Sequence, residues 1–455
     1  MKASIVAVAA ALALLPGAAL AQGKYVHANN SGYDTLDPHT VFDVARVATR
    51  LNFYDGLYRW VDNPPKLIPW LAESHTVSAD GLTWTFKLKP GTKFHDGSEL
   101  TAEDVVYSME RMLALKKGAA VLFLPVLEPG KTKAVDKHTV SFTLKEPSAI
   151  FGATVSEIHV VNSKQVKANT KGDDWGQPWL ARNVAGSGSY KLKRHDPALG
   201  FIGERNKDHF YGWGPKAFDE IEFRTVLETN TRVLGLIKGD YHGLDGYLTP
   251  DQIDRLKKEP SVQILEQESM RVFYYALNNA RPPLNDINFR KALNHAFDYD
   301  GFINDVMKGL VARNPTIIPN NMWGAPKDVK GYTFDLEKAK EYLSKVKEPL
   351  RPITIGVLAG FSETEQAAAL FQSTARKIGI DIRIEAAPWP VISSRMQNPD
   401  QNFDLVGLWK STYYADPNNW LGELYGSRYR PIRNTSGYSN PEVDKRIERA
   451  LVSTD

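Results

Sequence analysis

Apolar residues recur along the chain with two different periods, and these periods predict strands that alternate with helices. Alternating apolar and polar positions predict strands over residues 84–88, 139–144, 218–226, 243–247, 353–358, 381–386 and 403–409. Helical spacing predicts helices over residues 41–54, 228–237, 250–257, 289–308, 336–344, 363–378 and 441–451. Strands that alternate with helices are typical of open sheets covered by helices, so we predict an α/β fold.

One stretch, residues 84–112, combines a strand, a tight turn and a capped helix. A Pro-Gly pair ends the predicted strand, and an Asp-Gly dipeptide marks the turn. Thr101 suits the N-cap of the following helix, and Asp104, three residues later, predicts a capping box. This run resembles the signature region of the peptide/nickel class (family 5) of periplasmic solute-binding proteins, which feed ABC importers.

Two further blocks carry the same resemblance in the order that the family has them. Residues 185–190 (AGSGSY) resemble the family's Gly-Thr-Gly-Pro-Tyr segment, with Ser189 where proline is usual. Residues 278–298 (NNARPPLNDINFRKALNHAFD) resemble a longer family stretch that begins with Asn and ends with Asp. The resemblance implies a two-lobed periplasmic-binding-protein fold of type II, with an extra β-rich subdomain inserted in the first lobe. It also implies a protein that delivers a solute to the transmembrane subunits of an ABC permease and is not an enzyme.

The predicted elements divide the chain into a leader and two lobes. We expect residues 1–21 to be a signal peptide, residues 22–65 and 186–275 to form the first lobe, and residues 66–185 to be the subdomain inserted in it. Residues 276–455 are predicted to form the second lobe, with residues 271–278 as the crossing between the lobes. Because family members generally continue beyond this point, we expect a C-terminal return to the first lobe to be missing.

The N-terminal residues predict export. Lys2 precedes an apolar run over residues 3–15 and the small-residue pattern at residues 19–21, which is typical of a secretory signal peptide removed before Gln22. The chain has no cysteine, which excludes disulfides, thiolate chemistry and a lipidated cysteine anchor. We therefore expect a free periplasmic protein.

Charge and aromatic content narrow the function classes. Lys and Arg number 56 and Asp and Glu number 53, for a net charge of +3. Because the basic residues are dispersed among acids, the sequence argues against a nucleic-acid partner. We also expect a monomer. The 10 Trp, 19 Tyr and 19 Phe residues are enough for both cores and the walls of a ligand site.

The sequence contains no clear motif of an enzyme or of a metal site. Ser187 lies between two glycines, but the outer positions are Ala and Ser, so the segment is not a Gly-x-Ser-x-Gly elbow. The histidines form no His-x-x-x-His pair, and we expect neither a metal site nor a cofactor. His27, His39 and His295 stay open as ligands, because some relatives carry nickel complexes or haem.

Evidence for binding is concentrated in loops that follow strands, where ligands of open α/β sheets lie. In the second lobe the candidates are the stacking and apolar side chains of Trp389, Trp409, Tyr413 and Tyr414, together with Thr412 and Asp416 as a partner for a cation or hydroxyl group. In the first lobe the candidates are Asn30, Phe42, Gly186, Ser187 and Gly188, the last three through main-chain hydrogen bonds. The alternative for the tryptophans is that they only pack beneath their loops.

The resemblance sharpens the choice of ligand. Peptide-binding relatives hold the ligand's ammonium group with an aspartate shortly after the tryptophan equivalent to Trp409; this chain has Thr412 at that spacing, and Asp416 is the nearest acid. Dipeptide binders grip the carboxylate with an arginine where this chain has Gly360 and Phe361. A peptide is the default ligand, and longer peptides, opines, oligosaccharides and metal chelates remain open.

Two other function classes stay open. An exported carbohydrate-active hydrolase would also use aromatic platforms, and it would need two opposed carboxyl groups about 5 to 9.5 Å apart in the cleft. A ligand sensor for a membrane receptor is the third possibility, and it would be distinguished by transport that continues without the protein.

Overall fold

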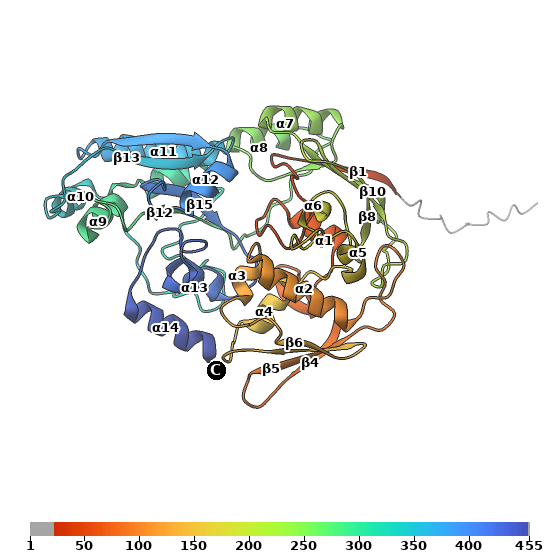
Figure 1. The fold of residues 1–455 in the computed structure, drawn as a ribbon. Coiled ribbons are helices and arrows are strands. Elements are labelled where there is room, and N and C mark those ends of the chain that lie inside the picture. Colours follow the sequence, from red (N-terminus) through yellow and green to blue (C-terminus); the bar gives the residue numbers. More distant parts are fainter. Residues whose placement is uncertain (1–21, 454–455) are drawn as a thin grey trace, which may run out of the picture.

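The computed structural model describes residues 22–453, which form two lobes (Figure 1). The first lobe comprises residues 22–257 and lies on the right of Figure 1, and the second lobe comprises residues 272–453 and lies on its left. Residues 258–271 connect them. The predicted signal peptide, residues 1–21, lies outside the described residues.

The first lobe is built around a five-stranded sheet with the strand order β11-β1-β10-β9-β8. Its strands are β1 (Gln22–Asn29), β8 (Tyr190–Asp196), β9 (Gly200–Arg205), β10 (Phe218–Thr225) and β11 (Gly243–Leu244). β1 runs parallel to β10 and β11, whereas β9 is antiparallel to β10 and β8. The helices are α1 (Val47–Phe53), α7 (Thr229–Lys238) and α8 (Pro250–Lys257). Tyr33, Phe53, Phe201 and Ile221 form the buried core of this part.

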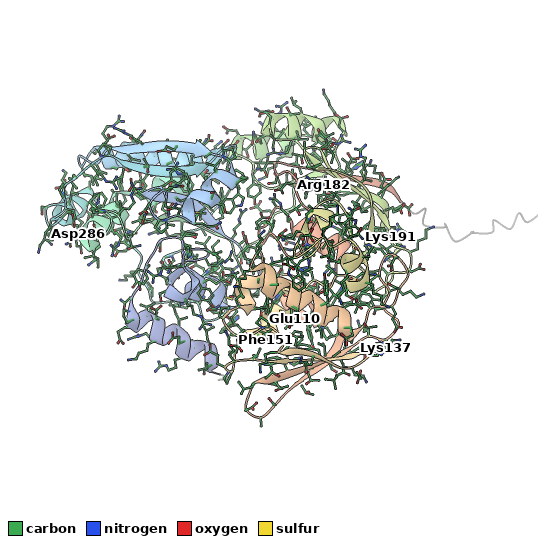
Figure 2. The ribbon with its side chains drawn as sticks, in the orientation of Figure 1. Glu110, Lys137, Phe151, Arg182, Lys191 and Asp286 are labelled. Atoms are coloured by element: carbon green, nitrogen blue, oxygen red, sulfur yellow. The ribbon has the colours of Figure 1, made fainter. Side chains whose placement is uncertain are left out.

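Residues 66–185, the predicted inserted subdomain, contain a second sheet of the first lobe, with the order β4-β5-β7-β6. Its strands are β4 (Ala72–Val77), β5 (Thr83–Leu88), β6 (Thr132–Asp136) and β7 (Thr139–Thr143), and a separate hairpin pairs β2 (Tyr58–Val61) with β3 (Lys66–Pro69). The helices are α2 (Ala102–Leu115), α3 (Ala120–Phe123), α4 (Phe151–Thr154), η1 (Val155–Glu157), α5 (Ser163–Ala168) and α6 (Gln177–Leu180). Side chains fill the space between the sheet and α2, among them Phe151, which Figure 2 labels.

The N-terminus of α2 confirms the predicted capping box. Asp104 Oδ2 accepts hydrogen bonds from the N–H of Thr101 at 2.9 Å and from its Oγ1 at 3.0 Å. Its Oδ1 accepts two more from Ser163, from the N–H at 3.0 Å and from Oγ at 2.7 Å. One buried carboxylate therefore starts α2 and also fixes the first residue of α5 to it.

The second lobe is built around a four-stranded sheet with the order β12-β15-β13-β14. Its strands are β12 (Val272–Leu277), β13 (Ile353–Leu358), β14 (Ile382–Ala387) and β15 (Leu405–Lys410). β13 runs parallel to β14 and β15, and β12 is antiparallel to β15. The helices are α9 (Ile287–Ala296), the π-helix η2 (Gly301–Val306), α10 (Leu336–Leu343), α11 (Ser362–Arg376) and α12 (Trp389–Met396). Phe289, Ile355, Phe371 and Leu405 lie in the core between sheet and helices.

The C-terminal part of the second lobe reaches the inserted subdomain. It contains η3 (Pro417–Asn419), α13 (Leu421–Tyr425), η4 (Ser427–Tyr429) and α14 (Pro441–Val452). Ile447 and Leu451 of α14 pack against Ile150, and the N–H of Ala149 donates to the carbonyl oxygen of Leu451 at 2.7 Å. The lobes therefore touch away from the connection as well as at it.

Several predicted elements differ from the structure. The helix predicted over residues 41–54 begins only at Val47, and it buries Thr49, Arg50 and Phe53, while Leu51 stays exposed. The helix predicted over residues 289–308 is interrupted. Phe297 is extended, and Asp298 Oδ1 accepts the N–H of Gly301 at 2.9 Å, which starts a new turn.

The predicted lobe boundary after residue 275 falls inside β12. All six residues of this strand, from Val272, pair with β15, so the strand belongs to the second sheet. The crossing therefore ends one residue before the strand, at Arg271.

Candidate functional site

The end of β15 brings Trp409 to the edge of the second sheet that faces the first lobe. Trp409 pairs with Phe273 of β12, and the two rings lie 5.3 Å apart between centroids. The parallel neighbour β13 ends at the same edge, and its following loop places the Phe361 ring 5.4 Å from Trp409. The loops that follow parallel strands meet here because the strands share one direction.

The first lobe contributes an aromatic ring to the same place. Tyr247, three residues after β11, lies 4.8 Å from Phe361 and 6.0 Å from Trp409 between ring centroids. The guanidinium carbon of Arg271 lies over the Tyr247 ring at 4.6 Å and over the Trp409 ring at 4.8 Å. We call Tyr247, Arg271, Phe361 and Trp409 the junction cluster, because its members come from both lobes and their connection.

Charged and polar groups surround the junction cluster. The N–H of Asn30 donates to Asp245 Oδ2 at 3.2 Å, and Glu363 stands in the first turn of α11. Burial raises the pKa of Glu363 above its ordinary value. Within residues 22–453, the side-chain amide nitrogen of Asn30 and one oxygen each of Asp245 and Glu363 are buried without a hydrogen-bond partner. Such groups favour a polar ligand, since an unpaired buried polar atom is costly.

A second interlobe contact joins Phe42 and Tyr413. Their ring centroids lie 4.2 Å apart, and the Arg433 guanidinium lies over both rings, at 5.1 Å from Phe42 and 4.9 Å from Tyr413. Arg50 approaches Glu157 at 3.8 Å. Glu157 Oε2 and Arg433 Nη2 are buried without a hydrogen-bond partner in the described part of the chain. Aromatic faces and charges of both signs therefore occur here too.

Below Tyr413, a buried charge network holds the loop that follows β15. Glu423 accepts hydrogen bonds from Lys410 at 2.5 Å, from Arg433 at 2.7 Å and from the Tyr414 hydroxyl at 2.9 Å. Burial, and then the neighbouring Arg433 charge, lower the pKa of Lys410 to about 7. Tyr414 and the nearby Trp420 are fully buried, so their side chains belong to this packing rather than to an open surface.

The glycine segment predicted to bind ligand, residues 186–188, packs in the interior of the first lobe. A Cβ at Gly186 would lie 1.9 Å from the carbonyl oxygen of Phe53, and one at Gly188 would lie 2.4 Å from its carbonyl carbon. The close approach that glycine permits is therefore made to the end of α1. Ser187 Oγ donates to Asp55 at 2.7 Å and is buried. A ligand contact of this segment stays a prediction.

The remaining predicted residues take different positions. Trp389 starts α12 and packs beside Ile392, Thr412 is exposed, and Asp416 Oδ1 accepts the N–H of Asn418 at 2.8 Å. Burial raises the pKa of Asp416. The structure thus separates the predicted residues into the neighbourhood of Trp409 and Asn30, the contact of Phe42 with Tyr413, and the remaining residues. Among the last, Tyr414 of the second lobe also packs in the core of the first lobe.

Sequence reasoning missed several residues that the junction brings together: Asp245, Tyr247, Arg271, Phe361, Glu363 and Arg433. A usable signal existed for Tyr247, the last residue of the predicted strand 243–247, and for Phe361, which follows the predicted strand 353–358. Arg433 carries no such signal, since it lies in a turn between η4 and α14 and meets Phe42 only through the tertiary fold.

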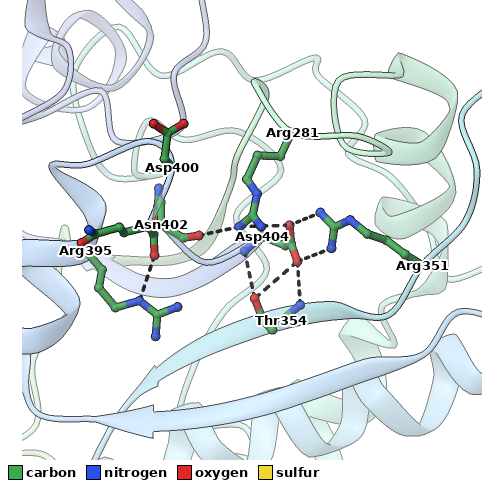
Figure 3. Close-up of a pocket in the computed structure, with 8 residues that line it drawn as sticks. Arg281, Arg351, Thr354, Arg395, Asp400, Asn402 and Asp404 are labelled. Atoms are coloured by element: carbon green, nitrogen blue, oxygen red, sulfur yellow. Dashed lines mark hydrogen bonds and ion pairs between the residues drawn. The ribbon is translucent and has the colours of Figure 1, made fainter.

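A separate hollow of about 500 Å³ lies at the opposite edge of the second sheet, at the amino ends of β13 and β15 (Figure 3). Arg351 donates to both carboxylate oxygens of Asp404, at 2.9 and 2.6 Å, and the N–H of Thr354 donates to the same side chain at 2.9 Å. Arg281 stands 3.7 Å from Asp404. Arg351 and Asp404 satisfy each other, so the hollow is walled by a structural ion pair and lies away from the lobe junction.

The geometry gives little support for catalysis. Ser187 contacts the acid Asp55, and His209 Nε2 lies 3.5 Å from the same carboxylate, so the serine is not paired with a histidine base. Among residues 22–453, no three His, Asp or Glu side chains are grouped to hold a metal ion. His39 and His295 instead contact main-chain carbonyl oxygens, of His159 and Thr333.

Known proteins similar to this chain are solute-binding proteins. Residues 66–430 match the model of bacterial extracellular solute-binding proteins, family 5, middle region. The chain is 34% identical over 388 residues to the probable D,D-dipeptide-binding periplasmic protein DdpA of Escherichia coli K12, covering 85% of this chain and 73% of that protein. It is 27% identical over 463 residues to the glutathione-binding protein GsiB of Escherichia coli O6:K15:H31, covering 100% of this chain and 88% of GsiB.

A solved structure agrees with these relatives. The periplasmic binding protein DppA of Helicobacter pylori, solved with the peptide STSA, superimposes with a TM-score of 0.86 at 26% identity. The match covers 95% of this chain and 87% of that chain. It confirms the predicted two-lobed α/β fold.

The comparisons also decide between the function classes. Relatives and structural neighbours are binding components of ABC importers, and the hydrolase interpretation finds no support among them. In the part of the chain from residue 22 to residue 453, no helix is both long enough and apolar enough to cross a membrane. The chain belongs to family 5 of the bacterial extracellular solute-binding proteins, the non-enzymatic binding components of ABC importers.

Proposed function

We propose that the protein captures a peptide or peptide-like solute between its two lobes and hands it to the transmembrane subunits of an ABC permease. The observation that carries this proposal is the pairing of aromatic rings across the lobes, Trp409 with Tyr247 and Tyr413 with Phe42. Aromatic faces from both sides enclose a solute without depending on its sequence.

Charges at the lobe junction favour a ligand with both a positive and a negative group. Asp245 and Glu363 stand beside the junction cluster, and Arg433 and Glu157 each keep a buried atom without a partner within residues 22–453. A peptide carries an ammonium and a carboxylate group at fixed ends, which matches such mixed charges. The ligands named for DdpA, GsiB and the Helicobacter DppA support the same class.

Ligand contacts on both lobes explain how occupancy is signalled. A solute that touches Trp409 and Tyr413 on one side and Tyr247 and Phe42 on the other binds the closed arrangement more tightly than the open one. That difference in affinity shifts the population towards closure, whereas a ligand with equal affinity would shift nothing. The connection over residues 258–271 and the strand β12 that follows it are the hinge in this proposal.

Localisation and assembly follow from the composition. We propose that residues 1–21 direct export and that the mature protein is free in the periplasm, because the chain has no cysteine to carry a lipid. The dispersed charges and the net charge of +3 argue against a nucleic-acid partner. We also propose that the protein is a monomer.

Native mass spectrometry of protein purified without denaturation tests the proposal. We expect a complex with a co-purifying small molecule whose fragments identify a peptide or a peptide-like compound. The proposal is contradicted by a bound sugar or metal chelate. It is also contradicted by a protein that carries no solute and gains none from a mixture of peptides.

A further inference from the structure

Arg271 has an unusual position at the lobe junction. It is the last residue of the connection and directly precedes β12. Its guanidinium lies over one ring from each lobe, Tyr247 at 4.6 Å and Trp409 at 4.8 Å. Since aromatic faces attract cations, these two rings form one cation-binding surface, which the protein's own side chain covers.

Two acids stand beside this surface. Asp245 Oδ1 and Glu363 Oε2 are buried and have no hydrogen-bond partner within residues 22–453, and the same holds for Arg271 Nε. Asp245 comes from the first lobe and Glu363 from α11 of the second lobe. A positive group placed between the lobes would therefore find acceptors on both sides, and Arg271 leaves those acceptors unused.

Arg271 supplies positive charge beside a group of acids. Arg232 lies 3.8 Å from Asp245 Oδ1, and the Arg271 charge acts on Glu363. Two further acids lie near these groups, Glu228 beside Arg232 and Glu365 beside Glu363, so removal of Arg271 would leave an excess of acidic groups in this half-buried site. That excess would attract a replacement cation.

We propose that Tyr247, Trp409, Asp245 and Glu363 form a subsite for an organic cation, and that Arg271 is a built-in occupant which the cationic group of the solute displaces. This inference rests on the proposed function, because the solute is taken to bind between the lobes. The ligand class is a solute with a guanidinium or ammonium group. Arg271 is attached by a flexible stem, so it leaves the rings without movement of the strand.

The two possible roles of Arg271, as a competitor of a ligand cation and as a binding group for a ligand carboxylate, predict opposite effects of its removal. A receptor arginine would attract a ligand carboxylate, so its removal would weaken binding. A competing arginine blocks a cation, so its removal strengthens binding. The sign of the change therefore separates the two roles.

The test compares two probes of nearly equal shape, butylguanidinium, which is positive, and butylurea, which is neutral. Their affinities are measured through tryptophan fluorescence or ligand-observed NMR for the wild type, Arg271→Ala and Arg271→Lys. We expect Arg271→Ala to bind butylguanidinium at least about tenfold more tightly than the wild type, and butylurea to change less than about threefold. Arg271→Lys keeps a cation on the rings and should remain close to the wild type.

The double variant Arg271→Ala/Glu363→Gln provides the matched control. It removes one acid of the subsite and should lose most of the gain for butylguanidinium. Unchanged or weaker binding of butylguanidinium to Arg271→Ala overturns the inference, and so does an equal gain for butylurea. Circular dichroism checks the fold, and Arg271→Met, which keeps an apolar stem over the rings, replaces the alanine variant if that variant unfolds.

This test is separable from the proposed function. If the wild type binds a solute and closes but Arg271→Ala shows no preference for the cation, only the subsite is wrong. If the wild type binds no solute at all, the result contradicts the proposed function itself.

Discussion

Trp409 takes its neighbours from distant parts of the chain. Tyr247 comes from the first lobe, Phe361 follows β13, and Arg271 ends the connection. The ring is half-buried, and the Arg271 guanidinium lies over it at 4.8 Å. A single side chain at this position affects both halves of the molecule.

Replacement of Trp409 tests its role in binding. We expect Trp409→Ala to weaken solute binding by about 2 kcal/mol or more, because a central aromatic ring is typical of binding hot spots. Isothermal titration with the co-purified solute measures the change.

Trp213 offers a matched control. It is also half-buried, and Arg205 lies 5.0 Å above its ring, but it packs on Tyr190 within the first lobe. Trp213→Ala should leave the affinity unchanged. Equal losses of affinity in both variants would remove Trp409 from the site.

His39 is a buried histidine held in its neutral form. Its Nδ1 lies 3.0 Å from Arg111, whose guanidinium also donates to both oxygens of Asp37, and its Nε2 lies 2.7 Å from the carbonyl oxygen of His159. Burial and the Arg111 charge lower the pKa of His39 from 6.5 to about 4.

This depressed pKa predicts acid sensitivity. Between pH 6.5 and about 4 the unfolded chain binds a proton at this histidine that the folded protein does not, so stability falls as the pH falls. As the pH falls from about 7 to about 5, protonation of His39 in the unfolded chain should lower the unfolding free energy by roughly 2 kcal/mol. Urea unfolding at both pH values measures this, and in His39→Gln the loss should be smaller by that amount. The same loss in the variant would show that another group titrates.

At the scale of elements, α2 depends on one carboxylate. Asp104 makes four hydrogen bonds, two to Thr101 at the start of α2 and two to Ser163 at the start of α5. The side chain is almost completely buried. It therefore links two helices of the inserted subdomain and also caps one of them.

Removal of this carboxylate should destabilise the subdomain. We expect Asp104→Ala to lower the unfolding free energy by about 2 to 4 kcal/mol, because it leaves several buried donors unpaired. The exposed neighbour Glu103 is the control, and Glu103→Ala should change stability by less than about 0.5 kcal/mol. Denaturant unfolding followed by circular dichroism measures both, and similar small effects would mean that water replaces the lost bonds.

Local patterns predicted some elements closely and others poorly. The limits of α8 and β13 agree with the predicted ranges 250–257 and 353–358. The break after Ala296 was missed because apolar spacing continues through the extended residue Phe297. For the site, Trp409 at the end of a predicted strand and Tyr413 in the loop after it are candidates from the sequence, and their contact with a ligand stays a prediction. Arg271 could not be predicted, because the rings it covers come from two lobes that only the tertiary fold brings together.

At the scale of the whole molecule, the central sheets of the two lobes remain separate, and the lobes meet through side chains and a main-chain hydrogen bond from Ala149 to Leu451. They meet at the junction cluster, at the contact of Phe42 with Tyr413, and where α14 packs on Ile150. In the proposed function the solute binds between the lobes, so transport would depend on their relative motion.

Solution X-ray scattering with and without the co-purified solute tests this property most directly. The account predicts a smaller radius of gyration when solute is added, together with recovery of the solute in chemically unaltered form. Saturation with solute that leaves the scattering curve unchanged, or recovery of a cleaved product, would contradict it.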